Sequence, residues 1–321
     1  METNFYISSC CENGGIYHYV MSDDGEVEFR KKTNCKNPMY AVIDNDKMYT
    51  ILRDPFSTNT ESGITYYDVN SDGTLSDAAH EIISTKGEVC CHLCVDSSNV
   101  YAVNYISGSV IKLPDRLVVH HGSGPNTKRQ DKAHAHFVSV SPSGEYVYVV
   151  DLGMDKIMTY DKDLNFVLST SAPAGIGPRH LAFSDDGKYA FCINELDSSV
   201  SVYLISGSEL ILKQTISTLP EGCGIKNTAA AIRFRDGHVY ASNRGHNSIA
   251  CFEFANNELV LKHIVDCGGA GPRDFNFVGD NYIVCTNENS NNVTFFKMDN
   301  DNLEKLDFEL KDITGALCVT V

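Results

Sequence analysis

The chain repeats one pattern six times, at intervals of about 43 to 51 residues. Each copy contains a short apolar strand, a tight polar turn and a second apolar strand. The clearest copy runs from Arg179 to Glu195, where Asp186-Gly187 lies between two alternating apolar runs, a strong hairpin signal. The second strands of the six copies end at Arg53, Asn104, Asp151, Asn194, Asn243 and Asn287. This repeat length is typical of the blades of a β-propeller.

A second pair of strands follows each hairpin, for example residues 199–204 and 210–213. Each unit is therefore an antiparallel meander, which buries its faces by stacking on its neighbours around an axis. A seventh unit comes from both chain ends, because residues 4–9, 15–20 and 26–30 supply three strands and residues 316–321 supply the fourth. We predict an all-β, seven-bladed propeller of four-stranded antiparallel blades, closed by the C-terminal strand joining the N-terminal blade. We expect residues 1–321 to form a single domain.

Composition limits the partners that such a chain can bind. The formal net charge is −16, which argues against nucleic acid and anionic membranes as partners, since both require basic surfaces. There is no run of 18 apolar residues, and Met1 to Asn4 lead into a strand without a basic and apolar leader, so we expect a cytoplasmic protein. The twelve cysteines lie mostly in apolar strand patterns, which predicts reduced core thiols. We expect a monomer without cofactor or metal.

Unusual residues gather at one rim of the predicted ring. The first strands of the hairpins begin at Cys91, His136, Arg179, Ala230 and Arg273, and the second strands end at Asp54, Tyr105, Leu152, Glu195, Arg244 and Glu288. In an antiparallel hairpin these two ends share one edge, so both sets line the same mouth of the channel. Arginine pairs with carboxylate or phosphate, and histidine moves protons near neutrality. The set predicts a small anionic substrate and acid–base chemistry; inter-blade salt bridges are the structural alternative.

Four stretches of the chain resemble a known family. They are Gly177–Phe183, Asn194–Tyr203, the loop His121–Asn126 that precedes His134-Ala135-His136, and Ser242–Ile249. In this order they resemble the seven-bladed propeller lactonases, a family that contains propeller-type 6-phosphogluconolactonases and carboxy-cis,cis-muconate cyclases. The resemblance implies hydrolysis of a sugar-phosphate δ-lactone. The expected reaction converts 6-phosphogluconolactone to 6-phosphogluconate, a step of carbohydrate metabolism in the pentose phosphate pathway.

The resemblance also implies roles for individual residues. The catalytic residues would be His136 as general base, Arg179 and Arg244 for the oxyanion and the anionic substrate, and Glu195 either to orient His136 or to donate a proton to the leaving oxygen. Substrate contacts are expected at Arg273, His134, Arg129, Asn194 and Glu288. The loop 120–133 is either a basic lid over the pocket or a plain polar connection.

Three other functions fit parts of the pattern. A carboxymuconate-type lactonising cyclase also needs Arg, His and Glu around an anionic substrate. A metal-dependent lactonase is suggested by His120-His121 and by His134 and His136, which as residues i and i+2 of a strand would face the same way. A non-catalytic interaction scaffold is the third, because a propeller fold alone does not specify function.

Overall fold

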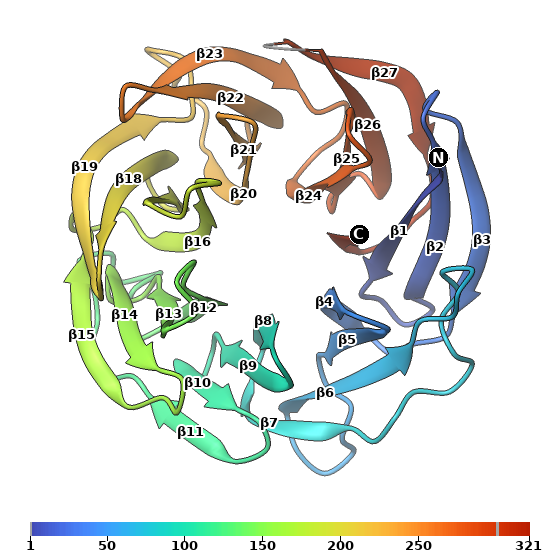
Figure 1. The fold of residues 1–321 in the computed structure, drawn as a ribbon, viewed down its shortest axis with the longest axis horizontal. Coiled ribbons are helices and arrows are strands. Elements are labelled where there is room, and N and C mark those ends of the chain that lie inside the picture. Colours follow the sequence, from blue (N-terminus) through green and yellow to red (C-terminus); the bar gives the residue numbers. More distant parts are fainter. Residues whose placement is uncertain (1, 300–301) are drawn as a thin grey trace.

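The protein forms a ring of seven four-stranded antiparallel sheets in a computed structural model that describes residues 2–299 and 302–321 (Figure 1). The N-terminal blade contains β28 (Ala316–Thr320), β1 (Glu2–Ser9), β2 (Gly15–Ser22) and β3 (Val27–Thr33). The second and third blades contain β4 (Pro38–Asp44), β5 (Lys47–Leu52), β6 (Glu61–Asp68) and β7 (Ile83–Glu88), then β8 (Cys90–Asp96), β9 (Asn99–Asn104), β10 (Ser109–Lys112) and β11 (Arg116–Val119).

The other four blades follow the same order, with the first strand of each innermost in the ring. The fourth and fifth contain β12 (Ala135–Val140), β13 (Tyr146–Asp151), β14 (Lys156–Asp161) and β15 (Phe166–Ser171), then β16 (Pro178–Phe183), β17 (Tyr189–Asn194), β18 (Ser199–Ser206) and β19 (Glu209–Ser217). The sixth and seventh contain β20 (Thr228–Arg235), β21 (His238–Arg244), β22 (Ser248–Ala255) and β23 (Glu258–Asp266), then β24 (Pro272–Val278), β25 (Tyr282–Asn287), β26 (Asn292–Asp299) and β27 (Asn302–Leu310). The predicted seven-bladed propeller is confirmed.

The ring is closed by the two ends of the chain. β28 is the innermost strand of the first blade and pairs antiparallel with β1, with Ile7 opposite Val319. This pairing leaves no open edge between the first and last blades, because a strand from the end of the chain completes a sheet begun at its start. The expected closure is therefore confirmed.

Local turn chemistry explains the hairpins, and packing between blades explains the ring. In the β16–β17 turn Gly187 has a φ of 67°, which glycine adopts without strain, and the Ser184 hydroxyl donates to Asp186 at 2.8 Å. Between the fifth and sixth blades, Phe191 of β17 packs with Ile232 and Val239 in one fully buried cluster. Similar clusters lie between the other blades, so each blade buries its faces only against its neighbours.

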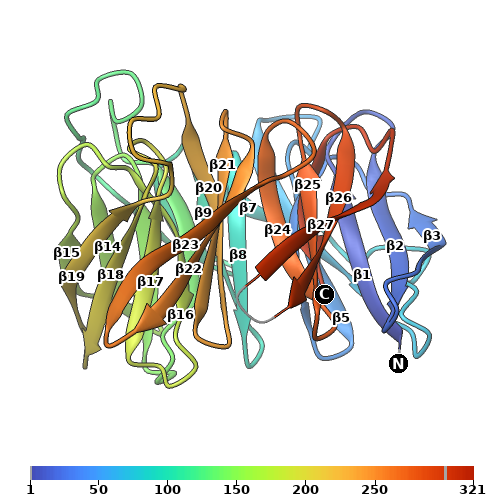
Figure 2. The ribbon, with the colours of Figure 1, turned by 90° about the horizontal axis from the view of Figure 1, so that it is seen from above.

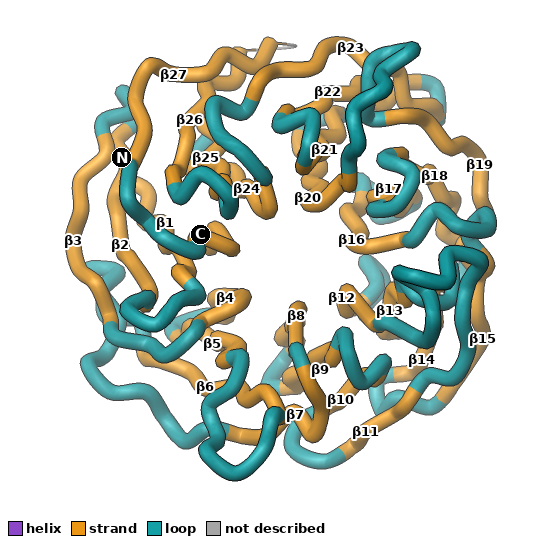
Figure 3. The backbone as a smooth tube through the Cα atoms, turned by 180° about the vertical axis from the view of Figure 1, so that it is seen from behind, coloured by secondary structure: helices purple, strands orange, loops and turns teal. Residues whose placement is uncertain are grey.

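The two faces of the ring differ in their connections (Figures 2 and 3). The long connections between β11 and β12 and between β19 and β20 lie on the face toward the viewer in Figure 3. This is the face at which the innermost strands begin, so it carries the rim predicted from the sequence. Within the described residues, no helix is long and apolar enough to cross a membrane.

Candidate active site

A β-bulge repeats at the start of the innermost strands and sets which side chains face the channel. In the fifth blade, Pro178 of β16 pairs with Asn194 of β17, and His180 pairs with Ile193. Arg179 is therefore an extra residue without a partner on the adjacent strand. Bulges of this kind re-aim side chains and are common beside active sites.

Equivalent bulges fall at the same height in neighbouring blades. The extra residue is Cys91 in β8, His136 in β12 and Arg273 in β24, and in β20 the two residues Ala230 and Ala231 lie opposite the single residue Ser242. The positions that the hairpin alignment singled out are thus the bulged positions of the ring. No residue pattern separately indicates the bulges, because the turn residues fix the register at the far end of each hairpin.

Glu195 connects three arginines from different parts of the fold. One carboxylate oxygen, Oε2, accepts from Nε of Arg179 and from Nη2 of Arg244, each at 3.0 Å. The other oxygen, Oε1, accepts from Nη2 of Arg129, which belongs to the connection between β11 and β12. Glu195 is 4% exposed, so its pairs with Arg179 and Arg244 are largely removed from solvent, whereas the side chain of Arg129 is 39% exposed.

The alanine bulge of β20 supplies further acceptors to the same arginines. Nη1 of Arg179 donates to the carbonyl oxygen of Ala230 at 2.7 Å, and Nη2 of Arg244 donates to that of Ala229 at 3.2 Å. The small alanine side chains leave room for both guanidinium groups. Through Arg179, Arg244 and Arg129, the carboxylate of Glu195 joins the fifth blade, the sixth blade and the β11–β12 connection.

The charges at this rim do not balance. The four arginines Arg129, Arg179, Arg244 and Arg273 form ion pairs with two glutamates, Glu195 and Glu288, so within this group of six described residues positive charge is in excess. Burial and the neighbouring Arg244 lower the pKa of Arg179, and burial lowers the pKa of Arg244 with a further contribution from Arg273. A bound anion would relieve this repulsion.

Glu195 is ionised in this setting. Burial by itself would raise the pKa of its carboxyl, but the arginines Arg244, Arg179 and Arg129 lower it to well below the usual range. A carboxylate held in this way accepts hydrogen bonds and does not donate a proton near neutral pH. The arrangement therefore favours a positioning role for Glu195 over a role as proton donor.

His136 lies beside this cluster and is buried and neutral. Burial, followed by the charge of Arg179, lowers the pKa of its imidazole well below 6.5. Its Nδ1 is buried and has no hydrogen-bond partner among the described residues. A neutral imidazole with an unpartnered nitrogen can accept a proton from a water or a hydroxyl group.

Two rings pack against His136, those of Tyr105 and His180, and neither was expected from the sequence to contact it. Tyr105 meets His136 edge-on at 5.5 Å between ring centroids, and His180 lies 5.1 Å away on the other side. Nη1 of Arg179 lies 3.2 Å from Nε2 of His180. Tyr105 had appeared in the rim alignment and His180 in the motif Gly177–Phe183, but spacing alone does not show that a ring will pack on another blade's histidine.

His134 is held away from His136. Its ring stacks on Tyr105 at 4.4 Å, its Nδ1 lies 3.0 Å from the carbonyl oxygen of Tyr105, and its Nε2 lies 3.1 Å from Asp131. Both ring nitrogens are therefore engaged, which leaves neither for a metal shared with His136. Among residues 2–299 and 302–321, no group of three or more His, Cys, Asp or Glu side chains is placed to hold a metal ion.

The remaining predicted residues lie at the edge of the cluster or inside a blade. Nη1 of Arg273 pairs with Glu288 at 3.2 Å, and both side chains are partly exposed at the rim. Asn194 is fully buried, and its amide nitrogen donates to Ser199 at 2.8 Å and Ser201 at 2.9 Å within its own blade. The structure thus brings together His136, Arg179, Glu195, Arg244 and Arg129, while the side-chain amide of Asn194 bonds inside the sheet.

The connection carrying Arg129 is anchored at both ends. Nδ1 of His120 lies 2.6 Å from Asp151, and the Tyr160 hydroxyl lies 2.9 Å from Nε2 of His120. At the other end Gln130 is fully buried and donates to the carbonyl oxygen of Leu152 at 2.9 Å. Arg129, whose side chain is 39% exposed, is held between these anchors at the entrance of the cluster.

Comparisons with known proteins agree with this architecture. The family model of the lactonases with a 7-bladed beta-propeller matches residues 4–321. The 6-phosphogluconolactonase of Bacillus subtilis is 32% identical and is aligned over 92% of this chain and 91% of its own length. A crystal structure of a Lactobacillus plantarum protein has a TM-score of 0.90 at 26% identity and covers 99% of both chains. The periplasmic gluconolactonase of Pseudomonas aeruginosa has a TM-score of 0.89 at 23% identity, with 99% of this chain and 98% of that one covered, which is a likeness of fold alone. The chain belongs to the lactonase family of seven-bladed β-propellers.

Proposed function

We propose that this protein hydrolyses the δ-lactone of a phosphorylated sugar acid, 6-phosphogluconolactone, with the cluster around Glu195 as its active site. The observation that carries the proposal is the excess of arginine around one buried glutamate, directly beside a neutral histidine. The excess charge suits an anionic substrate, and the histidine suits activation of water. The B. subtilis relative bears the name of this activity.

In the proposed reaction His136 acts on the attacking water. As the water oxygen bonds to the lactone carbonyl carbon, the imidazole takes the water proton, and the carbonyl oxygen becomes an oxyanion. When the bond between that carbon and the ring oxygen breaks, the imidazolium returns the proton to the leaving oxygen. The products are a carboxylic acid, which ionises, and a hydroxyl group, so that atoms and charge balance.

The arginines divide into two tasks in this proposal. Arg179 is almost fully buried, fixed by Glu195 and the carbonyl oxygen of Ala230, and therefore suits the oxyanion, which needs a rigid donor. Arg129 and Arg273 are more exposed and suit the substrate phosphate at the entrance. Glu195 remains ionised throughout and holds Arg179, Arg244 and Arg129 in register, which makes it a positioning residue.

The test compares two lactones that differ only in the phosphate group. We expect kcat/KM for 6-phosphogluconolactone to exceed that for unphosphorylated gluconolactone at least about tenfold, because contacts with a charged group contribute about 1.5–3 kcal/mol. Ring opening is followed as acid release, after subtraction of the spontaneous rate. Equal rates on the two lactones, or turnover of carboxymuconate but of neither lactone, would contradict the proposal.

A histidine variant tests the role of the base. His136→Asn should lower kcat for 6-phosphogluconolactone by about 10²–10⁴-fold, which is the usual contribution of a positioned base. His80→Asn, on the outer part of the second blade, is the matched control and should retain full activity. A His136→Asn variant that keeps its activity and its melting temperature would reject the assignment.

A further inference from the structure

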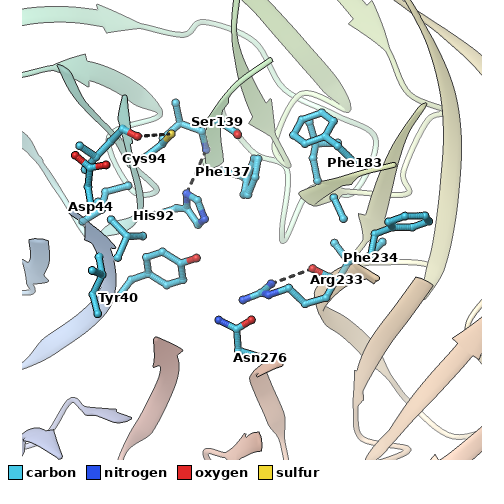
Figure 4. A pocket seen from close by; sticks show the side chains of 18 residues that line it. Tyr40, Asp44, His92, Cys94, Phe137, Ser139, Phe183, Arg233, Phe234 and Asn276 are labelled. Carbon is cyan, nitrogen blue, oxygen red and sulfur yellow. Dashed lines mark hydrogen bonds between the residues drawn. The ribbon is translucent and has the colours of Figure 1, made fainter. Parts of the chain in front are cut away.

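A second cavity opens at the other end of the central channel. It has a volume of about 430 Å³ and is built by the later halves of the innermost strands β4, β8, β12, β16, β20 and β24 (Figure 4). The bulged residues of the candidate active site stand at the beginnings of these strands. The cavity therefore faces the opposite side of the ring, which is the side toward the viewer in Figure 1.

A layer of rings separates the cavity from the candidate active site. His92 lies 4.4 Å from Tyr40 and 4.3 Å from Phe137 between ring centroids. Behind them His180 lies 5.2 Å from His92 and 5.3 Å from Phe137, and it is in turn the neighbour of His136. These contacts form a chain of rings from the cavity to the candidate active site, and Tyr40 also lines a small space beside Arg179 and Arg273.

Arg233 directs its guanidinium group into this cavity, where Figure 4 places it opposite the Tyr40 hydroxyl. Nη2 donates to Asp274 at 2.8 Å and Nη1 donates to the carbonyl oxygen of Ile232 at 2.9 Å. These two bonds fix the planar group and use two of its five N–H donors. The side chain is 21% exposed and lines the cavity, and no other hydrogen bond of this guanidinium group is found among the described residues.

His92 adds another donor at the floor of the cavity. Its Nδ1 accepts from the backbone N–H of Val138 at 3.5 Å, the long end of hydrogen-bond distance. Burial lowers the pKa of this imidazole well below 6.5, so the ring is neutral and carries its single proton on Nε2. In Figure 4 the ring lies between Tyr40 and Phe137 and faces the centre of the cavity.

The acceptors around the cavity are occupied or peripheral. Asp274 accepts from Arg233 with one oxygen and from the backbone N–H of Val319 with the other, at 3.0 Å. The side-chain oxygen of Asn276 accepts from the N–H of Phe277 at 3.0 Å, and its nitrogen donates to Val319. Figure 4 places the carboxylate of Asp44 at the margin, away from the central groups.

We propose that this cavity binds a small organic carboxylate with a flat apolar body. The three central polar groups, Tyr40 O–H, His92 Nε2–H and the free N–H groups of Arg233, can all donate, and such a set is complementary to an oxyanion. The ring of Phe137 lies beside these polar groups and supplies apolar surface for the body of the ligand, whereas the rings of Phe183 and Phe234, which also line the cavity, pack against Tyr148 and Phe191 between the blades. This site is distinct from the proposed lactonase site and does not depend on it.

Benzoate is the probe, and benzamide is its uncharged counterpart of the same shape. We expect titration calorimetry to give saturable benzoate binding in the millimolar range or tighter, with benzamide bound at least about tenfold more weakly, as the loss of a charged hydrogen-bond acceptor predicts.

Tyr40→Phe and Arg233→Lys should each weaken benzoate binding several-fold. The first keeps the ring and the second keeps the charge opposite Asp274, so both are designed to fold. Tyr66→Phe, on the outer strand β6, is the control and should bind as the wild type does.

An anion could instead enter the arginine cluster at the other face, and an Arg244→Lys variant separates the two sites. Benzoate binding that persists in Arg244→Lys and is weakened in Tyr40→Phe supports the proposal, whatever the lactonase activity of either variant. Binding that is lost in Arg244→Lys and unchanged in Tyr40→Phe overturns it. Absence of benzoate binding to the wild-type protein, or equal affinity for benzamide, also overturns it.

Discussion

Nε of Arg179 lies 3.0 Å from Oε2 of Glu195, and both side chains are almost fully buried. Arg179 belongs to the first strand of the fifth blade and Glu195 follows the second strand, so this pair closes one hairpin at the mouth of the channel. The same carboxylate also binds Arg244 of the sixth blade and Arg129 of the β11–β12 connection. Glu195 is therefore a structural hub as well as a member of the proposed active site.

Replacing Glu195 should cost both stability and activity. In Glu195→Gln the buried arginines lose their counter-charge, and breaking a buried pair of this kind costs about 3–5 kcal/mol. The free energy of unfolding, measured by urea titration, should fall by that amount. Glu288→Gln is the matched control, because its pair with Arg273 is partly exposed and should contribute at most about 1 kcal/mol. Equal losses in the two variants would argue against a hub at Glu195.

Arg129 should act mainly on substrate binding. Its side chain is 39% exposed, so Arg129→Met should lower the free energy of unfolding by no more than about 1 kcal/mol. If it contacts the substrate phosphate, KM for 6-phosphogluconolactone should rise about tenfold with a smaller change in kcat. Lys128→Met, at the exposed neighbouring position, controls for charge and should leave KM unchanged. A fall in kcat without a change in KM would place Arg129 in a different role.

Lowering the pH should reduce the free energy of unfolding, because three buried histidines on the innermost strands resist protonation in the folded state. Burial is the largest cause that lowers the pKa of His92, His136 and His180 well below 6.5. Below pH 6.5 the unfolded chain therefore binds protons that the folded chain does not, and stability falls as the pH falls. Each such histidine adds about 1.4 kcal/mol per pH unit to the slope of the free energy of unfolding against pH. The three together add about 4 kcal/mol per pH unit. The slope is highest between pH 6.5 and the lowered pKa values.

The pH dependence can be checked by urea unfolding at a series of pH values from neutral to mildly acidic. His92→Phe keeps a ring between Tyr40 and Phe137 and removes one titrating group, so the slope should fall by about 1.4 kcal/mol per pH unit. The lowered pKa of Glu195 adds a separate loss of stability only at lower pH, where the carboxyl group of the unfolded chain begins to take up protons. A slope that is the same in His92→Phe and the wild type would contradict the assignment of a neutral, buried His92.

The turn residues made the fold and the height of the site predictable. A Ser-Gly or Asp-Gly turn fixes the register of a hairpin, and counting back from it placed His136 and Arg179 at one level of the ring. Counting back from the Gly279-Asp280 turn placed Arg273 at the same level. The bulges at that level were not predictable, since the extra residue shows only as a shift in pairing between two strands. The path of the β11–β12 connection, which brings Arg129 to Glu195, depends on anchors from other strands, such as the carbonyl oxygen of Leu152.

Asn194 belongs to a repeated pattern of asparagines that bond within their own blades. Its amide nitrogen donates to Ser199, and Asn104 and Asn243 bond in the same way to Ser109 and Ser248 of their own blades. The recurrence of asparagine followed five residues later by serine is visible in the sequence and indicates a bond within the blade. The cavity lined by Arg233 had no such signal, because its walls come from six strands that are far apart in the chain.

Ring closure by the C-terminal strand should control the stability of the whole propeller. Val319 is 2% exposed and lies in a buried cluster with Phe5 and Ile7 of β1, whereas Val321, two residues further, is 44% exposed. Val319→Asp buries a charge at the strand pair that joins the first and last parts of the chain. We expect it to lower the free energy of unfolding by at least about 3 kcal/mol, and Val321→Asp to change it by at most about 0.5 kcal/mol.

Removal of residues 315–321 should be more severe, because the first blade then loses its innermost strand and β1 presents an open edge to the channel. Melting temperatures measured by circular dichroism distinguish these cases. A truncated protein that melts at the wild-type temperature would show that β28 does not hold the ring closed.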